Sequence, residues 1–226
     1  MKFLIDDANI ARIREIWSTY PCDGVTTNPS ILAKSGRPPF EVLSEIRALI
    51  GDEAELHVQV LSHTAEGMLG EAERITAVLG KNTYIKVPTT PEGVRAMALL
   101  SSRGFRITAT AIYAPMQVYF AAKAGADYVA PYVNRIENLG QDGAEVVRRM
   151  QDMLENNGFT TKILAASFKN SYQVQALCEY GVGACTVAPD VIDGLLKNEN
   201  VAWAVEAFEK SFATLCGEGK TMLDCN

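Results

Sequence analysis

A lysine stands inside a short apolar segment, which is an unusual place for a charged side chain. Lys86 lies in the stretch Tyr84-Ile85-Lys86-Val87-Pro88, and lysine is rarely buried without a partner or a function. One explanation is structural: the aliphatic stem follows apolar surface and the ammonium group stays in water. The other is chemical: burial lowers the pKa of the amine, and a neutral amine can attack a carbonyl to form a Schiff base. Spacing alone leaves both explanations open.

Polar side chains also stand at the ends of other short apolar segments. Asp6 directly follows Phe3-Leu4-Ile5, where it could act as an acid or base or could cap the next helix. Asp7 is the better-placed cap, which leaves Asp6 available for chemistry. Gln59 lies within an apolar segment and needs hydrogen-bond partners if it is buried, either in the protein core or on a substrate.

Further candidates carry less information one at a time. Threonine is at home in strands, and a loop arginine is normally solvated unless an anion lies nearby. His57 and His63 are expected to be ordinary strand and loop residues rather than metal ligands. The remaining candidates are Thr26, Asn28, Thr110, Tyr132, Arg135 and Ser167.

Eight short apolar segments alternate with longer segments of helical periodicity, and these elements must position the candidates. The predicted strands are 3–5, 24–27, 56–60, 84–87, 106–110, 128–130, 162–166 and 184–187. The predicted helices are 8–19, 39–50, 64–79, 91–103, 114–124, 141–157, 170–180 and 189–197, with a ninth at about 200–214. Short strands that are apolar throughout are typical of a parallel sheet covered on both faces.

The number and size of these units indicate the fold. Eight strand–helix units in 226 residues amount to roughly 28 residues per unit, which fits a (β/α)8 TIM barrel with an extra C-terminal helix. The alternative is an open doubly wound sheet, but the sequence lacks the glycine-rich phosphate turn of that fold. In a barrel the C-terminal ends of the strands form the catalytic face. We therefore expect Asp6, Gln59 and Lys86 to meet there.

Composition argues against several classes of protein. Apolar residues make up 48% and charged residues 21% of the chain, as in an ordinary globular protein. The net charge of −6 gives no bulk attraction for nucleic acid, and the longest uncharged segment, 107–122, is too short for a membrane span. Five cysteines without a C-x-x-C pair and only two histidines argue against a metal site. Since the N-terminal apolar stretch is too short for a secretory signal, we expect a cytoplasmic protein with reduced thiols.

Four motifs lie in order along the predicted strands. They are Gly24-Val25-Thr26-Thr27-Asn28-Pro29-Ser30, Lys86-Val87-Pro88, Ala130-Pro131-Tyr132-Val133-Asn134-Arg135 and Ala165-Ala166-Ser167-Phe168-Lys169. Together they resemble the motifs of the small transaldolase family, and more closely those of its fructose-6-phosphate aldolases. The resemblance covers nearly the whole chain, including the last helix. It implies a (β/α)8 barrel that uses no metal and no organic cofactor.

The resemblance also implies a role for each matching residue. Lys86 would form a Schiff base with C2 of a ketose, and Asp6 would take the proton of the C4 hydroxyl as the C3–C4 bond breaks. A water molecule that carries protons would be held by three side chains, those of Gln59, Thr110 and Tyr132. Substrate would be bound by four others: Thr26 beside Asp6, Asn28 and Ser167 at the hydroxyls of the dihydroxyacetone unit, and Arg135 with Ser167 at the phosphate.

Two positions bear on which reaction the resemblance implies. Gln59 and Tyr132 are the combination of the aldolases, whereas the transaldolases typically have glutamate and phenylalanine there. The implied activity is cleavage of fructose 6-phosphate to dihydroxyacetone and glyceraldehyde 3-phosphate, with these small molecules as partners. The alternatives are transfer of dihydroxyacetone between sugar phosphates, the same chemistry on a sulfonated ketose, or an inactive barrel that serves as a binding module. His57 stands where the aldolases usually have an aromatic apolar residue. We therefore expect it on the acceptor side of the site, where the aldehyde binds.

The chain is expected to divide into a catalytic barrel, residues 1–200, and a helix with its tail, residues 201–226. A barrel is complete after eight units, so the ninth helix has no place in the ring. Its apolar stripe consists of Trp203, Val205, Phe208, Phe212 and Leu215. Either this stripe packs on a neighbouring subunit or it folds over the bottom of its own barrel. The resemblance favours the neighbour, because the related aldolases are decamers of two pentameric rings.

Overall fold

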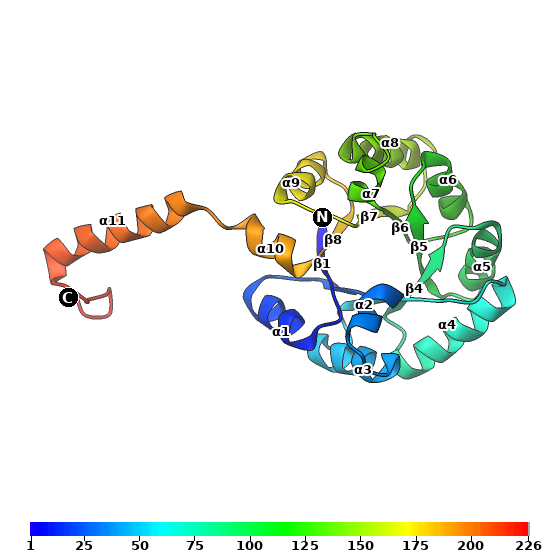
Figure 1. The fold of residues 1–226 in the computed structure, drawn as a ribbon, viewed down its shortest axis with the longest axis horizontal. Helices are drawn as coiled ribbons and strands as arrows, with labels where there is room; N and C mark the ends of the chain where they lie inside the picture. Colours follow the sequence, from blue (N-terminus) through cyan, green and yellow to red (C-terminus); the bar gives the residue numbers. More distant parts are fainter. Residues whose placement is uncertain (226) are drawn as a thin grey trace. The chain divides into compact units, whose positions relative to one another are not determined.

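Eight short parallel strands follow one another around a ring in chain order, and the last pairs with the first (Figure 1). The computed structural model describes residues 1–225. The strands are β1 (Lys2–Asp6), β2 (Gly24–Thr26), β3 (Glu55–Gln59), β4 (Thr83–Pro88), β5 (Arg106–Ile112), β6 (Tyr128–Pro131), β7 (Lys162–Ala165) and β8 (Ala184–Val187). The predicted TIM barrel is therefore confirmed.

Helices surround this ring and cover the outer faces of the strands (Figure 1). Those that were predicted are α1 (Ile10–Thr19), α3 (Pro39–Ile50), α4 (Ala65–Leu79), α5 (Pro91–Ser102), α6 (Pro115–Lys123), α8 (Gly143–Asn156), α9 (Ser171–Tyr180) and α10 (Pro189–Leu195). Two short helices, α2 (Pro29–Lys34) and α7 (Val133–Glu137), were not predicted. They follow β2 and β6, so they lie in the loops of the catalytic face.

The strands alternate between side chains that face the helices and side chains that face the barrel axis. In β3, Leu56 and Val58 are apolar, whereas Glu55, His57 and Gln59 occupy the alternate positions. At the N-terminal end of the barrel the axis is filled by a cluster of buried residues, namely Leu4, Tyr84, Tyr128, Leu164 and Ala184. Polar groups continue upward from this cluster to the catalytic face.

The turn after β1 differs from the expectation. Asn9, and not Asp7, caps α1: its side chain accepts hydrogen bonds from the backbone N–H groups of Ala11 (3.1 Å) and Arg12 (3.3 Å). The Asp7 carboxylate instead accepts from the N–H groups of Ala8 (2.7 Å) and Asn9 (3.2 Å). Asn9 is the N-cap because it directly precedes the first helical residue, Ile10. Asp6 takes part in neither arrangement.

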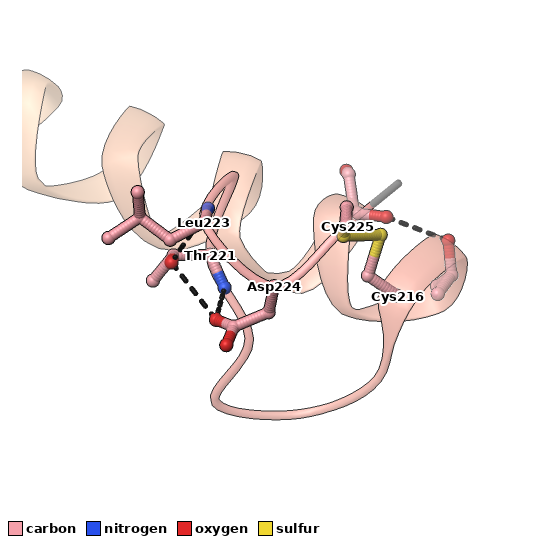
Figure 2. Close-up of a disulfide and its surroundings, with 7 residues drawn as sticks. Cys216, Thr221, Leu223, Asp224 and Cys225 are labelled. Carbon is pink, nitrogen blue, oxygen red and sulfur yellow. Dashed lines mark hydrogen bonds between the residues drawn. A yellow bond between two sulfur atoms is a disulfide. The ribbon is translucent and has the colours of Figure 1, made fainter.

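The chain divides after Ile192, eight residues before the expected boundary at 200, and the second unit contains α11 (Glu199–Cys216). Cys216 and Cys225 form a disulfide across the loop that follows this helix (Figure 2). The Asp224 carboxylate accepts hydrogen bonds from the N–H (2.8 Å) and hydroxyl (3.0 Å) of Thr221. The expectation of reduced thiols is thus wrong for these two cysteines. Asn226, the end of the expected segment, lies outside the described residues.

Candidate active site

Lys86 projects from β4 into the barrel, where only 5% of the residue is exposed. Its Nζ donates a hydrogen bond to the backbone carbonyl of Thr27 (2.7 Å) on the far side of β3. Burial lowers the pKa of the amine, and the nearby charge of Asp6 opposes this effect. The ammonium group therefore does not lie in water, and the chemical explanation for this lysine is the better one.

Asp6 ends β1 at the mouth of the barrel. Burial raises the pKa of its carboxyl group, whereas the charge of Lys86 and a hydrogen bond from Thr26 act against the increase. The Thr26 hydroxyl donates to Asp6 Oδ1 (2.7 Å) and lies 2.6 Å from the hydroxyl of Thr186. Because Thr26 has one hydrogen to give, Thr186 must be the donor to Thr26. The carboxylate has few donors and is suited to accept a proton.

Thr186 lies on β8, a strand that supplies none of the residues predicted from the sequence. It faces the axis at a position next to β1 and β2, and it is buried. The hydroxyl chain from Thr186 through Thr26 to Asp6 fixes the orientation of the carboxylate. In the sequence, only the place of Thr186 in the strand Ala184-Cys185-Thr186-Val187 bears on this, because alternate side chains of a strand face the same side.

The three predicted water-binding residues lie on β3, on β5 and directly after β6. Gln59 is the register partner of Lys86 between β3 and β4. The hydroxyl groups of Thr110 and Tyr132 are 2.9 Å apart and share a hydrogen bond. Thr110 is itself the register partner of Pro88, two residues beyond Lys86. The register therefore brings Gln59 beside Lys86, and Thr110 and Tyr132 meet further along the barrel, each on a different strand or loop.

Asn28 and Ser167 lie in loops at the catalytic face, where Asn28 caps a helix and Ser167 has an unusual backbone conformation. The Asn28 side-chain oxygen accepts from the N–H of Ile31 (3.0 Å) and caps α2, so the oxygen is held toward the helix while both amide hydrogens remain for a ligand. Ser167 has φ of 63°, and Ala111, next to Thr110, has φ of 58°. In residues 1–225 these are the two non-glycine residues with positive φ. Such strain is costly and tends to occur at functional sites.

Arg135 lies on α7 and is exposed at the same end of the barrel. Its guanidinium carbon lies 4.6 Å from the centre of the Tyr132 ring, and Nη1 donates to the hydroxyl of Tyr113 (3.2 Å). The sequence analysis did not select Tyr113. Arg135 is therefore held near the proposed water site, with several N–H groups available for an anion.

His57 lies away from the acceptor side, contrary to our expectation. It is completely buried and stacked on Tyr84, with ring centres 4.5 Å apart. Its Nδ1 lies 2.8 Å from the Thr108 hydroxyl, and its Nε2 lies 3.4 Å from Glu55 Oε2. His57 precedes Gln59 by two positions on β3, and both of its ring nitrogens already have partners toward the N-terminal end of the barrel, so that expectation is wrong. His57 points into the barrel because alternate side chains of β3 face the barrel axis.

Two negative findings concern the described chain only. Residues 1–225 hold no group of three or more histidine, cysteine, aspartate or glutamate side chains that could bind a metal ion. In the same residues, each helix is too short or too polar to cross a bilayer.

Comparison with known proteins gives a consistent result over nearly the whole chain. Residues 3–223 match the family model described as Transaldolase/Fructose-6-phosphate aldolase. A protein of Streptococcus pneumoniae named probable fructose-6-phosphate aldolase is 41% identical over 209 residues, which is 92% of this chain and 94% of that protein. A protein of Geotalea daltonii named probable transaldolase is 39% identical over 198 residues, 88% of this chain and 91% of that protein. The resemblance drawn from the motifs is confirmed.

Proposed function

Because the chain belongs to the transaldolase/fructose-6-phosphate aldolase family of enzymes, we propose that it is a class I aldolase. Its reaction is the reversible cleavage of fructose 6-phosphate to dihydroxyacetone and glyceraldehyde 3-phosphate. The observation that carries this proposal is the pair formed by the buried Lys86 and the half-buried Asp6 inside the barrel, whose pKa values are shifted toward the neutral amine and the neutral acid. Each group can therefore exchange protons closer to neutral pH than it would in water.

In the proposed reaction, the neutral amine of Lys86 attacks C2 of the ketose, and loss of water gives a protonated imine. Asp6 then accepts the proton of the C4 hydroxyl. The C3–C4 bond breaks, its electron pair moves into the imine, and the aldehyde leaves. The remaining three-carbon enamine takes a proton at C3, and water releases dihydroxyacetone from Lys86.

The surrounding residues supply binding and proton transfer in this proposal. Arg135 and Ser167 bind the phosphate, while the amide hydrogens of Asn28 bind a hydroxyl of the dihydroxyacetone unit. Thr26 holds Asp6 in place. A water molecule between Gln59, Thr110 and Tyr132 carries the protons of imine formation and hydrolysis.

A transaldolase is the second candidate, because a relative bears that name. In a transaldolase the enamine attacks another sugar aldehyde, such as erythrose 4-phosphate, before it takes up a proton. The hydrogen bond between Tyr132 and Thr110 favours the aldolase, since a hydroxyl at this place can help protonate the enamine. Free dihydroxyacetone from fructose 6-phosphate supports the aldolase, and sedoheptulose 7-phosphate formed with erythrose 4-phosphate supports the transaldolase.

Borohydride trapping tests the covalent step. With dihydroxyacetone present, reduction should add one three-carbon unit per chain, and peptide mapping should place it on Lys86. Lys86→Met should lose both the adduct and turnover, and Lys86→Arg should do no better because guanidinium stays protonated. Lys81→Met changes an exposed lysine and serves as the control. An adduct on another lysine would refute the mechanism. A panel of phosphorylated and sulfonated ketoses then identifies the anion.

We also propose that the protein is a cytoplasmic homo-oligomer, a decamer of two pentameric rings, with α11 packed on a neighbouring subunit. The support is the apolar surface of this helix, where Trp203 is 62%, Phe208 70% and Leu215 82% exposed. Such a stripe is unfavourable in water. Deleting residues 201–226 should give smaller particles with lower thermal stability. Phe208→Glu should weaken the assembly, while Leu139→Glu, at an exposed barrel loop, should not. An intact oligomer after the deletion argues for a helix that folds elsewhere.

A further inference from the structure

Tyr113 lies where two proposed active-site groups meet, and nothing so far explains its presence. It follows β5 and contacts Arg135 and Tyr132, which belong to α7 and its N-terminal cap. We propose that Tyr113 is a positioning residue that sets specificity: it holds the Arg135 guanidinium over the Tyr132 ring, ready for the phosphate of the substrate. This inference rests on the proposed function and adds a residue to it.

The contacts form a closed triangle of side chains. Arg135 Nη1 donates to the Tyr113 hydroxyl (3.2 Å), and the guanidinium carbon lies 4.6 Å from the centre of the Tyr132 ring. The rings of Tyr113 and Tyr132 are 5.6 Å apart and meet edge to face at 84°. Stacking restricts the plane of the guanidinium, and the hydrogen bond restricts its rotation within that plane. Neither contact alone would fix the orientation.

The backbone of Tyr113 is itself held in place, which a positioning residue requires. Gln117 on α6 turns back so that its side-chain oxygen accepts from the N–H groups of Tyr113 (2.8 Å) and Ala114 (3.0 Å). Two residues earlier, Ala111 has φ of 58°. The positive φ thus lies near the end of β5, and the turn that follows, which carries Tyr113, is held by the hydrogen bonds to Gln117.

The benefit of this arrangement is the reduced cost of ordering an exposed arginine. Arg135 is exposed, and a free arginine side chain loses rotational entropy when it binds an anion. If folding has already fixed the guanidinium, binding does not incur this cost again. One N–H group is used by Tyr113, and the others can form two parallel hydrogen bonds to phosphate oxygens.

Tyr113→Phe removes the hydroxyl and keeps the ring against Tyr132. Loss of one such hydrogen bond corresponds to a roughly threefold to tenfold effect, so KM for fructose 6-phosphate should rise by that factor. kcat should stay within about twofold, because the contacts of Tyr132 persist. The condensation of dihydroxyacetone with unphosphorylated glyceraldehyde should not change. Tyr172→Phe, at an exposed tyrosine of α9, is the matched control.

Tyr113→Leu removes the ring as well as the hydroxyl. Its comparison with Tyr113→Phe separates the ring contact with Tyr132 from the hydrogen bond to Arg135. Beyond the rise in KM, it should lower the release of dihydroxyacetone, since Tyr132 loses its edge-to-face neighbour. If both variants reduced kcat equally for phosphorylated and unphosphorylated substrates, Tyr113 would be merely structural and the inference would be wrong.

Direct binding of inorganic phosphate keeps this test independent of turnover. Calorimetry should show weaker phosphate binding to Tyr113→Phe than to the wild type, by the same threefold to tenfold, and no change for Tyr172→Phe. Equal phosphate affinity in wild type and Tyr113→Phe overturns the inference, even if the enzyme is an aldolase. Failure of the wild type to form an imine with dihydroxyacetone overturns the proposed function instead.

Discussion

Two carboxylates face the inside of the same barrel, and their pKa values move in opposite directions. Burial raises the pKa of Asp6, at the C-terminal ends of the strands. Burial acts in the same sense on Glu55, at the N-terminal ends, but hydrogen bonds with His57 and Lys2 and the charge of Lys2 lower its pKa to about 2. The difference lies in the donors around each group. One carboxylate is left able to take a proton, and the other is not.

The surroundings of Glu55 amount to a complete set of partners. Its carboxylate pairs with Lys2 and accepts from the hydroxyls of Tyr84 (3.3 Å) and Tyr128 (3.3 Å). An ionised carboxylate only accepts, so His57 Nε2 must carry the hydrogen that it shares with Glu55. Burial lowers the pKa of His57 to about 4, hence the ring is neutral and its Nδ1 accepts from Thr108. Glu55, His57, Tyr84 and Tyr128 form the floor of the barrel and are fixed by these contacts, whereas within residues 1–225 the Asp6 carboxylate accepts one side-chain hydrogen bond, from Thr26.

The largest expected effect comes from exchanging each carboxylate for its amide. Asp6→Asn cannot accept the C4 proton, so cleavage should slow by about 10²- to 10⁴-fold. Trapping with dihydroxyacetone should persist, because Lys86 remains, and loss of the Asp6 charge should lower the lysine pKa further. Steady-state turnover and borohydride adducts, followed against pH, measure both effects.

Glu55→Gln provides the opposite half of this test. It should leave turnover nearly unchanged but lower the free energy of unfolding by about 1–3 kcal/mol, since buried donors lose their charged acceptor. Urea denaturation at fixed protein concentration measures the loss. If Glu55→Gln abolished turnover while Asp6→Asn kept it, the division of roles between the two carboxylates would be reversed.

The fold was predictable because the strand pattern is strong. All eight strands were predicted with ends within two residues of those observed. α2 and α7 were missed, because helices of six and five residues are too short to show a period. The disulfide was missed for a different reason: an odd number of cysteines spread over the chain does not show which two meet.

The candidate site was predictable where one residue was out of place in its own segment. Lys86 and Asp6 stood out as charged groups within or beside apolar strands. Thr186 did not, since threonine is common in strands and only the pairing with β1 brings it to Thr26. Tyr113 depends on the path of a loop toward a residue 22 positions later. Such contacts follow from tertiary packing and leave no local pattern.

Two tyrosines four residues apart extend the comparison to a smaller effect. Tyr132 shares a hydrogen bond with Thr110 at the catalytic end, and Tyr128 donates to Glu55 on the floor. Tyr132→Phe should slow the release of dihydroxyacetone and favour transfer to erythrose 4-phosphate, by about 10²-fold at the low end for a proton-transfer group. Tyr128→Phe should leave this ratio unchanged and lower stability. Product analysis with both acceptors decides, and an unchanged ratio in Tyr132→Phe contradicts its role.

The last expected effect is nearly absent at pH 7: it concerns the neutral His57 and appears in the acid dependence of stability. Unfolded, the imidazole binds a proton near pH 6.5; folded, burial holds its pKa at about 4, although Glu55 acts in the opposite sense. Between these values the unfolded state binds more protons, so stability falls as pH falls, by at most about 1.4 kcal/mol per pH unit. Glu55 adds a second loss between about pH 4.5 and about 2.

His57→Phe should remove the first loss and reduce the second, because Glu55 keeps Lys2 but loses its hydrogen bond with His57. Phenylalanine retains the stack on Tyr84, and the groups that face this position, Glu55, Lys2, Lys86 and Tyr128, all remain. Urea unfolding from pH 7 to 4 should therefore show a shallower decline in the variant, with turnover at pH 7 little changed. His63→Gln, at the only other histidine, should retain the wild-type slope because that side chain is exposed. Parallel slopes for wild type and His57→Phe would contradict this prediction. They would mean that the folded protein protonates His57 as readily as the unfolded chain does. The contrast between the floor of the barrel and Asp6 would then depend on Glu55 alone.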